Sequence, residues 1–297
     1  MKPLRFGIIG LSEGNGHPYS WAAIFNGYDP AAMATCPFPV IPAYLAERSF
    51  PADAVAGATV THVWTQDAAV AAHVAAASRI PNVVADVTDM IGHVDGVLLA
   101  RDDAEAHFEF AAPFLEAGVP VFIDKPLALS VAEAKRIYAA QARPGLVFTC
   151  SALKYAAEFL PAAERVAELG AVRYITGTTP KQWDTYAVHV LDPLQHFVRG
   201  AGAVIRTATS GGKTRSLDIQ WESGLEARVT ALGDLSGPIG ITLHGDRGWL
   251  EMRFTDSFTA FRAALRHFTD IVRGDKPPQD PAEVLAVVEL IEAGRTG

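Results

Sequence analysis

The chain has 297 residues, of which 49% are hydrophobic and 20% charged, and this composition excludes a disordered or fibrous protein. The formal net charge of -8 argues against nucleic acid and anionic membranes as partners, because both are negatively charged. The two cysteines, Cys36 and Cys150, are too far apart in sequence to predict a disulfide framework or a cysteine zinc site. No apolar run reaches the ~18 residues of a spanning helix, and the N-terminal run is too short for a signal peptide, so we expect a cytoplasmic protein.

The first half of the chain alternates short apolar strands with helices. We expect strands at 6–9, 60–65, 82–85, 96–100, 119–123 and 146–150, and helices from Pro18 and at 67–78, 104–117 and 130–141. Repeated β-α-β units with unbroken apolar strands predict a parallel sheet that helices cover on both faces. A proline-rich insertion from Asp29 to Pro51 separates the first helix from the second strand, and we expect it to form a lid or wall of a substrate pocket.

The pattern changes after Ser151. We expect a helix at 156–169, then alternating strands at 172–178, 216–221, 226–232, 239–244 and 249–253, with hairpin turns at 222–224 and 245–248. Helices at 257–273 and 281–293 follow. The sequence therefore predicts a doubly wound α/β domain of the Rossmann type over residues 1–150, and an α+β domain with an open-faced, mostly antiparallel sheet over residues 151–297.

A glycine-rich loop joins the first strand to the first helix. The backbone N–H groups of such a loop, together with the N-terminus of the helix, can hold the diphosphate of a dinucleotide. Here Gly10, Gly14 and Gly16 depart from the usual G-x-G-x-x-G spacing, Ser12 replaces the second glycine, and Glu13 is an acidic neighbour for a diphosphate. A tight turn without a ligand is the alternative interpretation.

Polar residues also follow other strands at the carboxyl edge of the expected sheet, where such folds bind ligands. The second strand ends in Thr65 rather than in an acid that would hold the ribose of NAD, and no arginine follows to hold the 2'-phosphate of NADP, so both cofactors stay open. Asp67 is predicted to cap the next helix. His107 is either a ligand-facing residue or a buried histidine with satisfied hydrogen bonds. The expected cofactor contacts are Gly10, Leu11, Ser12, Gly14, Asn15, Gly16, Trp64, Thr65, Arg101, Asp102, His107 and Asp124.

The segment Asp124-Lys125-Pro126 ends an apolar strand at this edge. A lysine that sheds water in a cleft would have a lowered pKa, and would suit proton transfer to a carbinol or carbonyl oxygen. The alternative is an exposed lysine, which is the default for this residue type.

The order of the glycine loop, Arg101 with His107 six residues later, and the segment 118–128 resembles the Gfo/Idh/MocA (glucose-fructose oxidoreductase and inositol dehydrogenase) family. Segments 245–251 and 261–274 resemble the family's late hairpin and final helical segment, so the resemblance covers nearly the whole chain. It implies an NAD(P)-dependent dehydrogenase for a polyol, sugar or related hydroxy compound, assembled as a homodimer or homotetramer. Lys125 would lie beside the nicotinamide, with Asp124 in place of the family's glutamate.

The family's second catalytic element is an aspartate followed four residues later by a histidine. His189 matches the histidine, but Thr185 occupies the aspartate position and Asp184 is one residue away. Either Asp184 substitutes for the aspartate, or Lys125 and His189 alone handle the proton. The further residues that the resemblance implies for substrate contacts, with packing at the domain junction as the alternative, are Lys154, Tyr155, Trp183 and Tyr186.

Two other functions compete with the dehydrogenase. His189, Asp192 and His196 have the i, i+3, i+7 spacing of one helix face, which would suit a metal-dependent lyase or hydrolase. Asp192-Pro193 also predicts a helix start that would leave His189 outside the helix, so we expect no metal. The departures from the family pattern at Ser12, Thr65 and Thr185 would instead suit a nucleotide-sensing protein without turnover.

Overall fold

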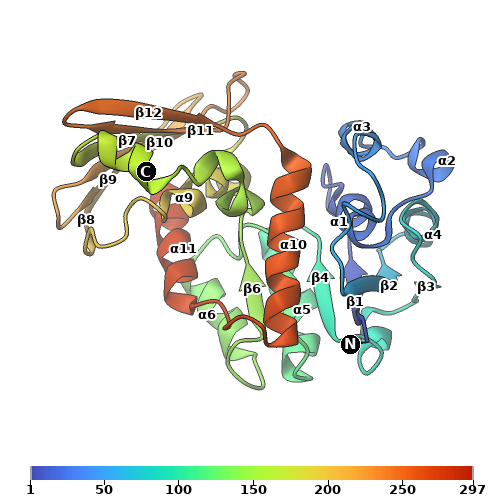
Figure 1. Cartoon of the computed structure of the whole chain (residues 1–297). Helices are drawn as coiled ribbons and strands as arrows, with labels where there is room; N and C mark the ends of the chain where they lie inside the picture. The colour runs from blue at the N-terminus through green and yellow to red at the C-terminus, as the bar shows by residue number, and fades with distance from the viewer. Residues whose placement is uncertain (1, 296–297) are drawn as a thin grey trace. The chain divides into compact units, whose positions relative to one another are not determined.

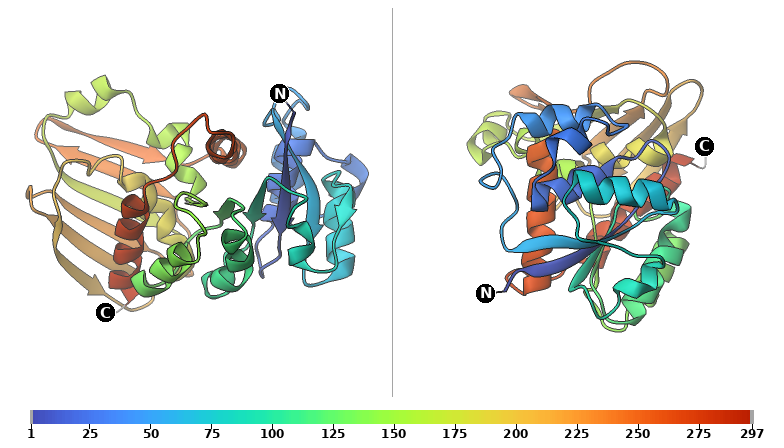
Figure 2. Two further views of the ribbon diagram at one scale, coloured as in Figure 1. Left: turned by 90° about the horizontal axis from the view of Figure 1, so that it is seen from below. Right: turned by 90° about the vertical axis from the view of Figure 1, so that its right-hand side faces the viewer.

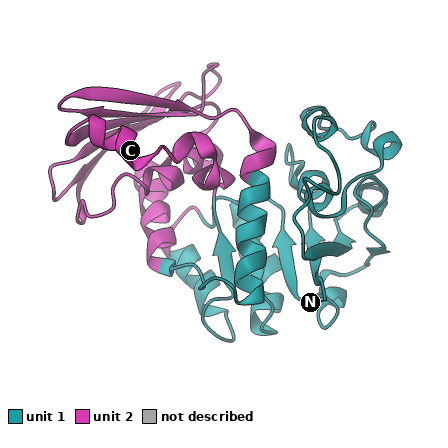
Figure 3. Ribbon diagram, in the orientation of Figure 1, with its two compact units in different colours: residues 1–128, 132–150, 261–281 teal, residues 129–131, 151–260, 282–297 magenta. Residues whose placement is uncertain are grey.

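The computed structural model describes residues 2–295, and the chain divides into two compact units (Figures 1 and 3). Unit 1 comprises residues 1–128, 132–150 and 261–281. Unit 2 comprises residues 129–131, 151–260 and 282–297. Unit 1 therefore takes a late helical segment in addition to the first half of the chain.

Unit 1 is built on six parallel strands in the order β3-β2-β1-β4-β5-β6. This order confirms the predicted Rossmann-type sheet. The chain winds outward from β1 in one direction and from β4 in the other, so the crevice between these two strands is the topological switch point where such sheets bind ligands. The strands are β1 (Leu4–Ile9), β2 (Ala58–Trp64), β3 (Asn82–Val83), β4 (Gly96–Leu99), β5 (Val121–Ile123) and β6 (Val147–Thr149).

Aromatic side chains attach the helices of unit 1 to this sheet. Phe6 of β1 contacts Phe25 of α1 and Phe268 of α10, with ring centroids 5.5 and 5.4 Å apart. Figures 1 and 2 show α10 running along one face of the strands, with α5 on the opposite face. The helices and 3₁₀ turns are α1 (His17–Asn26), α2 (Pro30–Met33), α3 (Val40–Ala46), α4 (Ala68–Ala77), η1 (Val87–Met90), η2 (Ala104–Ala106), α5 (His107–Glu116), α6 (Val131–Ala139) and α10 (Ser257–Arg273).

The proline-rich insertion forms α2 and α3 and packs against α1. The hydroxyl of Tyr44 in α3 donates a hydrogen bond to Ser20 Oγ in α1 at 2.5 Å. A Cβ added to Gly16, just before α1, would lie 2.5 Å from the side chain of Ile41, so glycine permits this close approach. The insertion therefore covers the beginning of α1, and its role as a wall of a substrate pocket stays a prediction.

Unit 2 contains a six-stranded sheet in the order β12-β11-β7-β10-β9-β8. All neighbouring pairs are antiparallel except β7 and β10, which confirms the prediction of a mostly antiparallel sheet. A Cβ added to Gly177 of β7 would lie 2.3 Å from Val190 of α9, so this helix packs closely on one face. The strands are β7 (Val172–Thr179), β8 (Val204–Ser210), β9 (Arg215–Trp221), β10 (Glu226–Ala231), β11 (Gly240–Gly245) and β12 (Gly248–Arg253).

The remaining segments of unit 2 correct three expectations. The helix expected at 156–169 is confirmed only over Ala163–Glu168, because Pro161 lacks an N–H group and disfavours the helical conformation of the residue before it. Pro193 lies inside α9, so the predicted helix start at Asp192 is wrong. Strand β8 was not predicted, because its side chains are almost all exposed and show no alternation. The helices and 3₁₀ turns are η3 (Ala152–Tyr155), η4 (Ala157–Phe159), α7 (Ala163–Glu168), α8 (Trp183–Tyr186), α9 (Val188–Leu194) and α11 (Pro281–Arg295).

Within the described part of the chain, no helix combines the length and the apolar character needed to cross a bilayer.

Candidate functional site

The centre of the candidate site in unit 1 is a buried ion pair. Lys125 directly follows β5, and its side chain is only 6% exposed. Its Nζ lies 3.2 Å from Oδ2 of Asp102, which follows β4. The Oγ of Ser12 in the glycine loop donates to Oδ1 of the same carboxylate at 2.6 Å. The ends of two neighbouring strands and the glycine loop are therefore joined at one carboxylate.

The surroundings of Asp102 decide its charge. Burial raises the pKa of this carboxyl, but the charge of Lys125, the hydrogen bond from Ser12 and the nearby His17 together outweigh burial and lower the pKa to about 2. Asp102 is therefore ionised at neutral pH, and it stabilises the ammonium form of Lys125. The sequence predicts a lowered pKa for Lys125 from burial alone. The structure adds the Asp102 carboxylate, which favours the charged lysine and so opposes the effect of burial.

Asp124 ties the backbone of Lys125 to the beginning of α1. Its Oδ1 accepts a hydrogen bond from the Lys125 backbone N–H at 2.8 Å. Its Oδ2 lies 2.5 Å from Nδ1 of His17 and accepts a hydrogen bond from Nδ2 of Asn15 at 2.9 Å. The His17 ring in turn stacks on Trp21, with centroids 4.9 Å apart. Asp124 thus holds the position of the lysine. His17 was not predicted, although its place after the glycine loop puts it at the same edge of the sheet.

The glycine loop combines one tightly packed glycine with one open position. A Cβ added to Gly10 would lie 2.3 Å from Cγ of Pro18, so the loop can turn this close to α1 only with glycine. Gly14 has a φ of +74°, and a Cβ there would meet no atom within 4 Å. The N–H of His17 already donates to the Asn15 side chain, and Pro18 has no N–H. The first turn of α1 therefore has few backbone donors left for a diphosphate, and the open space lies at Gly14.

Gln66, two residues after the end of β2, forms hydrogen bonds with the backbone of the glycine loop. Its Nε2 donates to the Leu11 carbonyl at 2.5 Å, and its Oε1 accepts from the Leu11 N–H at 2.9 Å. Arg101 Nη1 donates to the same carbonyl at 3.3 Å and to Gln66 Oε1 at 3.2 Å, while Nε and Nη2 bind Asp103 at 2.9 and 2.5 Å. Gln66 was not predicted, although it lies one residue after Thr65, at the strand end where a residue that holds the ribose was expected.

Three residues expected to contact a cofactor use their polar groups inside unit 1. His107 is fully buried, and its ring nitrogens lie 3.0 and 2.8 Å from two backbone carbonyl oxygens, as the core-histidine alternative described. The Thr65 hydroxyl donates to a backbone carbonyl two residues on, and Trp64 Nε1 donates to the carbonyl of Ala85. Asp67 caps α4 through hydrogen bonds to two backbone N–H groups, as predicted.

Unit 2 contains a second cluster, centred on Ser151. The Ser151 Oγ lies 2.9 Å from Nδ1 of His189 in α9, and the Ser151 N–H donates to Oδ2 of Asp192 at 2.8 Å. The Nζ of Lys154 lies 3.2 Å from Oδ1 of Asp192. Burial raises the pKa of Asp192, against the opposing effects of the Lys154 ammonium and the Ser151 N–H. His189 is therefore oriented by a serine that is itself fixed to a buried ion pair.

The first half of the chain matches a known protein family. Residues 4–151 match the model of an oxidoreductase family with an NAD-binding Rossmann fold, GFO_IDH_MocA. The chain belongs to the Gfo/Idh/MocA family. No curated protein gives a significant sequence match.

Solved structures share the Gfo/Idh/MocA fold over almost the entire chain. An apo scyllo-inositol dehydrogenase from Lactobacillus casei has 14% identity and a TM-score of 0.76, with 99% of this chain and 96% of that chain covered. UDP-N-acetylglucosamine 3-dehydrogenase from Acidithiobacillus ferrooxidans has 18% identity and a TM-score of 0.73, with coverage of 99% and 97%. A biliverdin reductase from Synechocystis, solved with biliverdin and NADP+, has 19% identity and a TM-score of 0.72, with coverage of 99% and 98%. At these identities the likeness shows a common fold.

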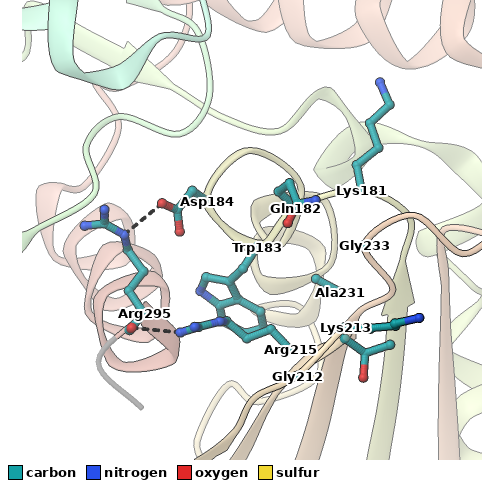
Figure 4. A pocket seen from close by; sticks show the side chains of 11 residues that line it. Lys181, Gln182, Trp183, Asp184, Gly212, Lys213, Arg215, Ala231, Gly233 and Arg295 are labelled. Atoms are coloured by element: carbon teal, nitrogen blue, oxygen red, sulfur yellow. Dashed lines mark hydrogen bonds and ion pairs between the residues drawn. The ribbon is translucent and has the colours of Figure 1, made fainter.

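The second catalytic element of the Gfo/Idh/MocA pattern is altered in this chain. Asp184, one of the two alternatives for the family aspartate, has its carboxylate 3.0 Å from Arg295 Nε and lines a separate pocket (Figure 4). Nδ1 of His189 instead contacts the hydroxyl of Ser151. No local pattern indicates this contact, because the two residues are 38 positions apart.

The expected substrate residues have different surroundings. Lys154 is buried beside Asp192, and Tyr155 is half-buried at the end of η3. The Tyr186 ring meets His189 edge to face, with centroids 4.9 Å apart. Trp183 is buried, and its Nε1 donates to a backbone carbonyl in α11 of the same unit.

The metal-site alternative has no support from the geometry. Asp192 contacts Lys154 and the backbone of Ser151, while Nε2 of His196 lies 2.8 Å from the Lys154 carbonyl. Among residues 2–295, no group of three His, Cys, Asp or Glu side chains is arranged to hold a metal ion.

Proposed function

We propose that this protein is an NAD(P)-dependent dehydrogenase or reductase. It would transfer a hydride between nicotinamide and a carbinol or carbonyl carbon of a polyol, sugar or related hydroxy compound. The observation that carries the proposal is the buried Lys125 at the carboxyl edge of the Rossmann sheet, paired with an ionised Asp102. The family match supports the cofactor class, and the names of similar structures, which include inositol and UDP-sugar dehydrogenases, support the substrate class.

The glycine loop leaves space for a nicotinamide dinucleotide. The space at Gly14 is open, and the hydrogen bonds of Gln66 and Arg101 hold the loop at Leu11. When bound, the nicotinamide would accept or supply the hydride. The proposal covers both NAD and NADP, because Thr65 replaces the ribose-binding acid while the Arg101 guanidinium is already paired with Asp103.

Lys125 would handle the proton that accompanies the hydride. In the reducing direction its ammonium donates a proton to the carbonyl oxygen, and in the oxidising direction the neutral amine accepts the proton of the hydroxyl. While Lys125 is charged, Asp102 is ionised at neutral pH, since its pKa is then about 2. Its role is to orient the amine and to favour its reprotonation after each transfer.

His189 would be the second group that handles a proton in this proposal. Ser151 orients its ring through Nδ1, and so replaces the aspartate that the family pattern places at Thr185. A hydroxyl can either donate to Nδ1 or accept from it, so this contact is compatible with both neutral tautomers of the ring. Asp184 fits the role less well, because its carboxylate already pairs with Arg295.

The test begins with separate fluorescence titrations of NADH and NADPH. A panel of inositols, sugars and UDP-sugars is then screened with the tighter cofactor, for the wild type, Lys125→Met and the control Lys135→Met, an exposed lysine on α6. We expect Lys125→Met to lower kcat by about 100-fold or more while the cofactor Kd changes little. Full turnover in Lys125→Met would contradict the role of the lysine. Cofactor binding without turnover across the panel would favour the nucleotide-sensing alternative.

A further inference from the structure

Unit 2 contains a polar pocket that the proposed function does not use. Its volume is about 570 Å³, and the loop between β8 and β9, the end of β10, the beginning of α8 and the end of α11 line it (Figure 4). This volume lies within the range of pockets that hold small molecules. The pocket therefore has room for a ligand larger than a single inorganic ion.

The charge of the lining contrasts with that of the chain. Lys181, Lys213, Arg215 and Arg295 line the pocket, and within the described part of the chain Asp184 is the single acidic lining residue. The whole chain carries a formal charge of -8, so this gathering of cations is not a consequence of composition. A concave site lined by one sign of charge concentrates ligands of the opposite sign.

Among residues 2–295, three of these four cations form no ion pair with a carboxylate. Asp184 pairs with Arg295 at 3.0 Å. Arg215 Nη1 donates instead to the backbone carbonyls of Gly294 and Arg295, at 2.8 and 2.7 Å. Lys181 Nζ contacts the hydroxyl of Tyr186 at 2.6 Å and lies 4.4 Å from the centre of its ring. Carbonyl and phenol groups orient a cation but leave its net charge in place.

The walls of the pocket are held in position by backbone contacts. Lys181 and Gly233 form an antiparallel bridge, with both N–H···O distances at 3.0 Å. Gly233 has a φ of +60°, and a Cβ there would lie 2.5 Å from the Lys213 carbonyl, so the two loops approach closely only with glycine. Figure 4 shows Trp183 between these loops and the end of α11. A pocket with such fixed walls needs little ordering when a ligand binds.

We propose that this pocket binds a multiply charged oxyanion, such as a metabolite that carries a diphosphate or several carboxylates. The guanidinium groups of Arg215 and Arg295 supply planar donors that match oxyanion geometry, and the exposed lysines Lys181 and Lys213 supply mobile charge on flexible stems. No lining residue of the pocket has a role in the proposed function, and the link between the two sites is Tyr186, which contacts Lys181 and His189. The two proposals therefore stand or fall independently.

The experiment titrates the full chain with inorganic pyrophosphate and, separately, with citrate by isothermal calorimetry at constant ionic strength set with chloride. The two ligands distinguish phosphate from carboxylate chemistry. The proteins are the wild type, the double variant Lys181→Gln/Lys213→Gln, and the control Lys135→Gln on α6 of unit 1. Thermal melts establish that all three are folded.

We expect saturable binding of at least one of the two anions with one site per chain. The double variant should bind at least about tenfold more weakly, because it loses two charged donors, and the control should match the wild type. Equal affinity in the double variant would overturn the proposal. Absence of saturable binding, or displacement of the bound anion by NADH, would also overturn it, since displacement would locate the anion at the glycine loop.

Discussion

The ion pair between Asp102 and Lys125 leads to a quantitative prediction for Asp102→Asn. The asparagine keeps the size of the side chain and can still accept the hydrogen bond from Ser12. It removes the negative charge, and so leaves the buried Lys125 ammonium beside a neutral group. The substitution should therefore destabilise unit 1 chiefly through electrostatics and not through packing.

The pKa of Asp102 sets the size of this effect. A lowering of the Asp102 pKa from its ordinary value of 3.8 to about 2 in the folded protein corresponds to roughly 2 kcal/mol of stability at neutral pH. The Asp102 side chain is 20% exposed, so solvent screens the pair only in part. Because the folded-state pKa is lowered, this contribution is fully present above about pH 4 and is lost as the pH falls toward 2. Asp102→Asn should therefore lose about 2 kcal/mol at pH 7.

Urea titrations of the full chain test this prediction. Hydrogen exchange of peptides that cover β4 and β5 reports the unfolding of unit 1. The control is Asp275→Asn, an exposed carboxylate in the same unit. The deficit of Asp102→Asn relative to the wild type should shrink between pH 4 and pH 2, whereas the control should stay near zero. Equal stability of the two variants at pH 7, or a deficit that grows as the pH falls, would refute the reasoning.

Three further substitutions probe other parts of the two clusters. Gly10→Ala should lower the free energy of unfolding by about 1 to 3 kcal/mol, because its Cβ would meet Pro18 at 2.3 Å; unchanged urea midpoints would contradict this. Gln66→Ala should raise the cofactor Kd severalfold by loosening the glycine loop, which fluorescence titration measures, and an unchanged Kd would show that the loop holds without it. Ser151→Ala should change the ¹⁵N shift of His189 Nδ1, because this nitrogen loses its contact with the serine hydroxyl, and should lower kcat more than it raises KM, with recovery in Ser151→Thr. Identical spectra would remove Ser151 as the orienting group.

The arrangement of unit 1 was predictable because its signals are local. Unbroken apolar strands, a glycine loop and alternating helices predict a parallel sheet without knowledge of distant contacts. Where local signals are weak, prediction failed. The exposed strand β8 has no alternation to detect, and Pro161 divides a segment whose other residues favour a helix.

The candidate site was predictable only as separate pieces. The carboxyl-edge rule indicates Asp102 and Lys125 individually, because both follow strands of one parallel sheet. Their pairing depends on which strands are neighbours and on side-chain directions, and the two residues are 23 positions apart in sequence. The contact of Ser12 with Asp102 spans 90 positions. Such contacts arise from the assembled sheet, so motif spacing alone does not indicate them.

The departures from the family pattern bear on whether this chain is an enzyme or a sensor. Ser12 replaces a glycine, and its hydroxyl binds the Asp102 carboxylate. Thr65 replaces the ribose-binding acid, and the adjacent Gln66 braces the glycine loop. Thr185 replaces the aspartate, and Ser151 contacts His189 Nδ1.

Each departure is therefore accompanied by a hydrogen bond or contact within the candidate site. Ser12 makes it from the altered position itself, Gln66 from the next position, and Ser151 from elsewhere in the fold. In a site without proton transfer, a buried ammonium would only lower the stability of the fold, because burying a charge costs several kcal/mol unless the charge is paired. An apolar replacement of both Asp102 and Lys125 would remove that cost. The buried pair, which Ser12 contacts and Asp124 positions, therefore favours the proposed catalytic site over a protein that only binds nucleotide.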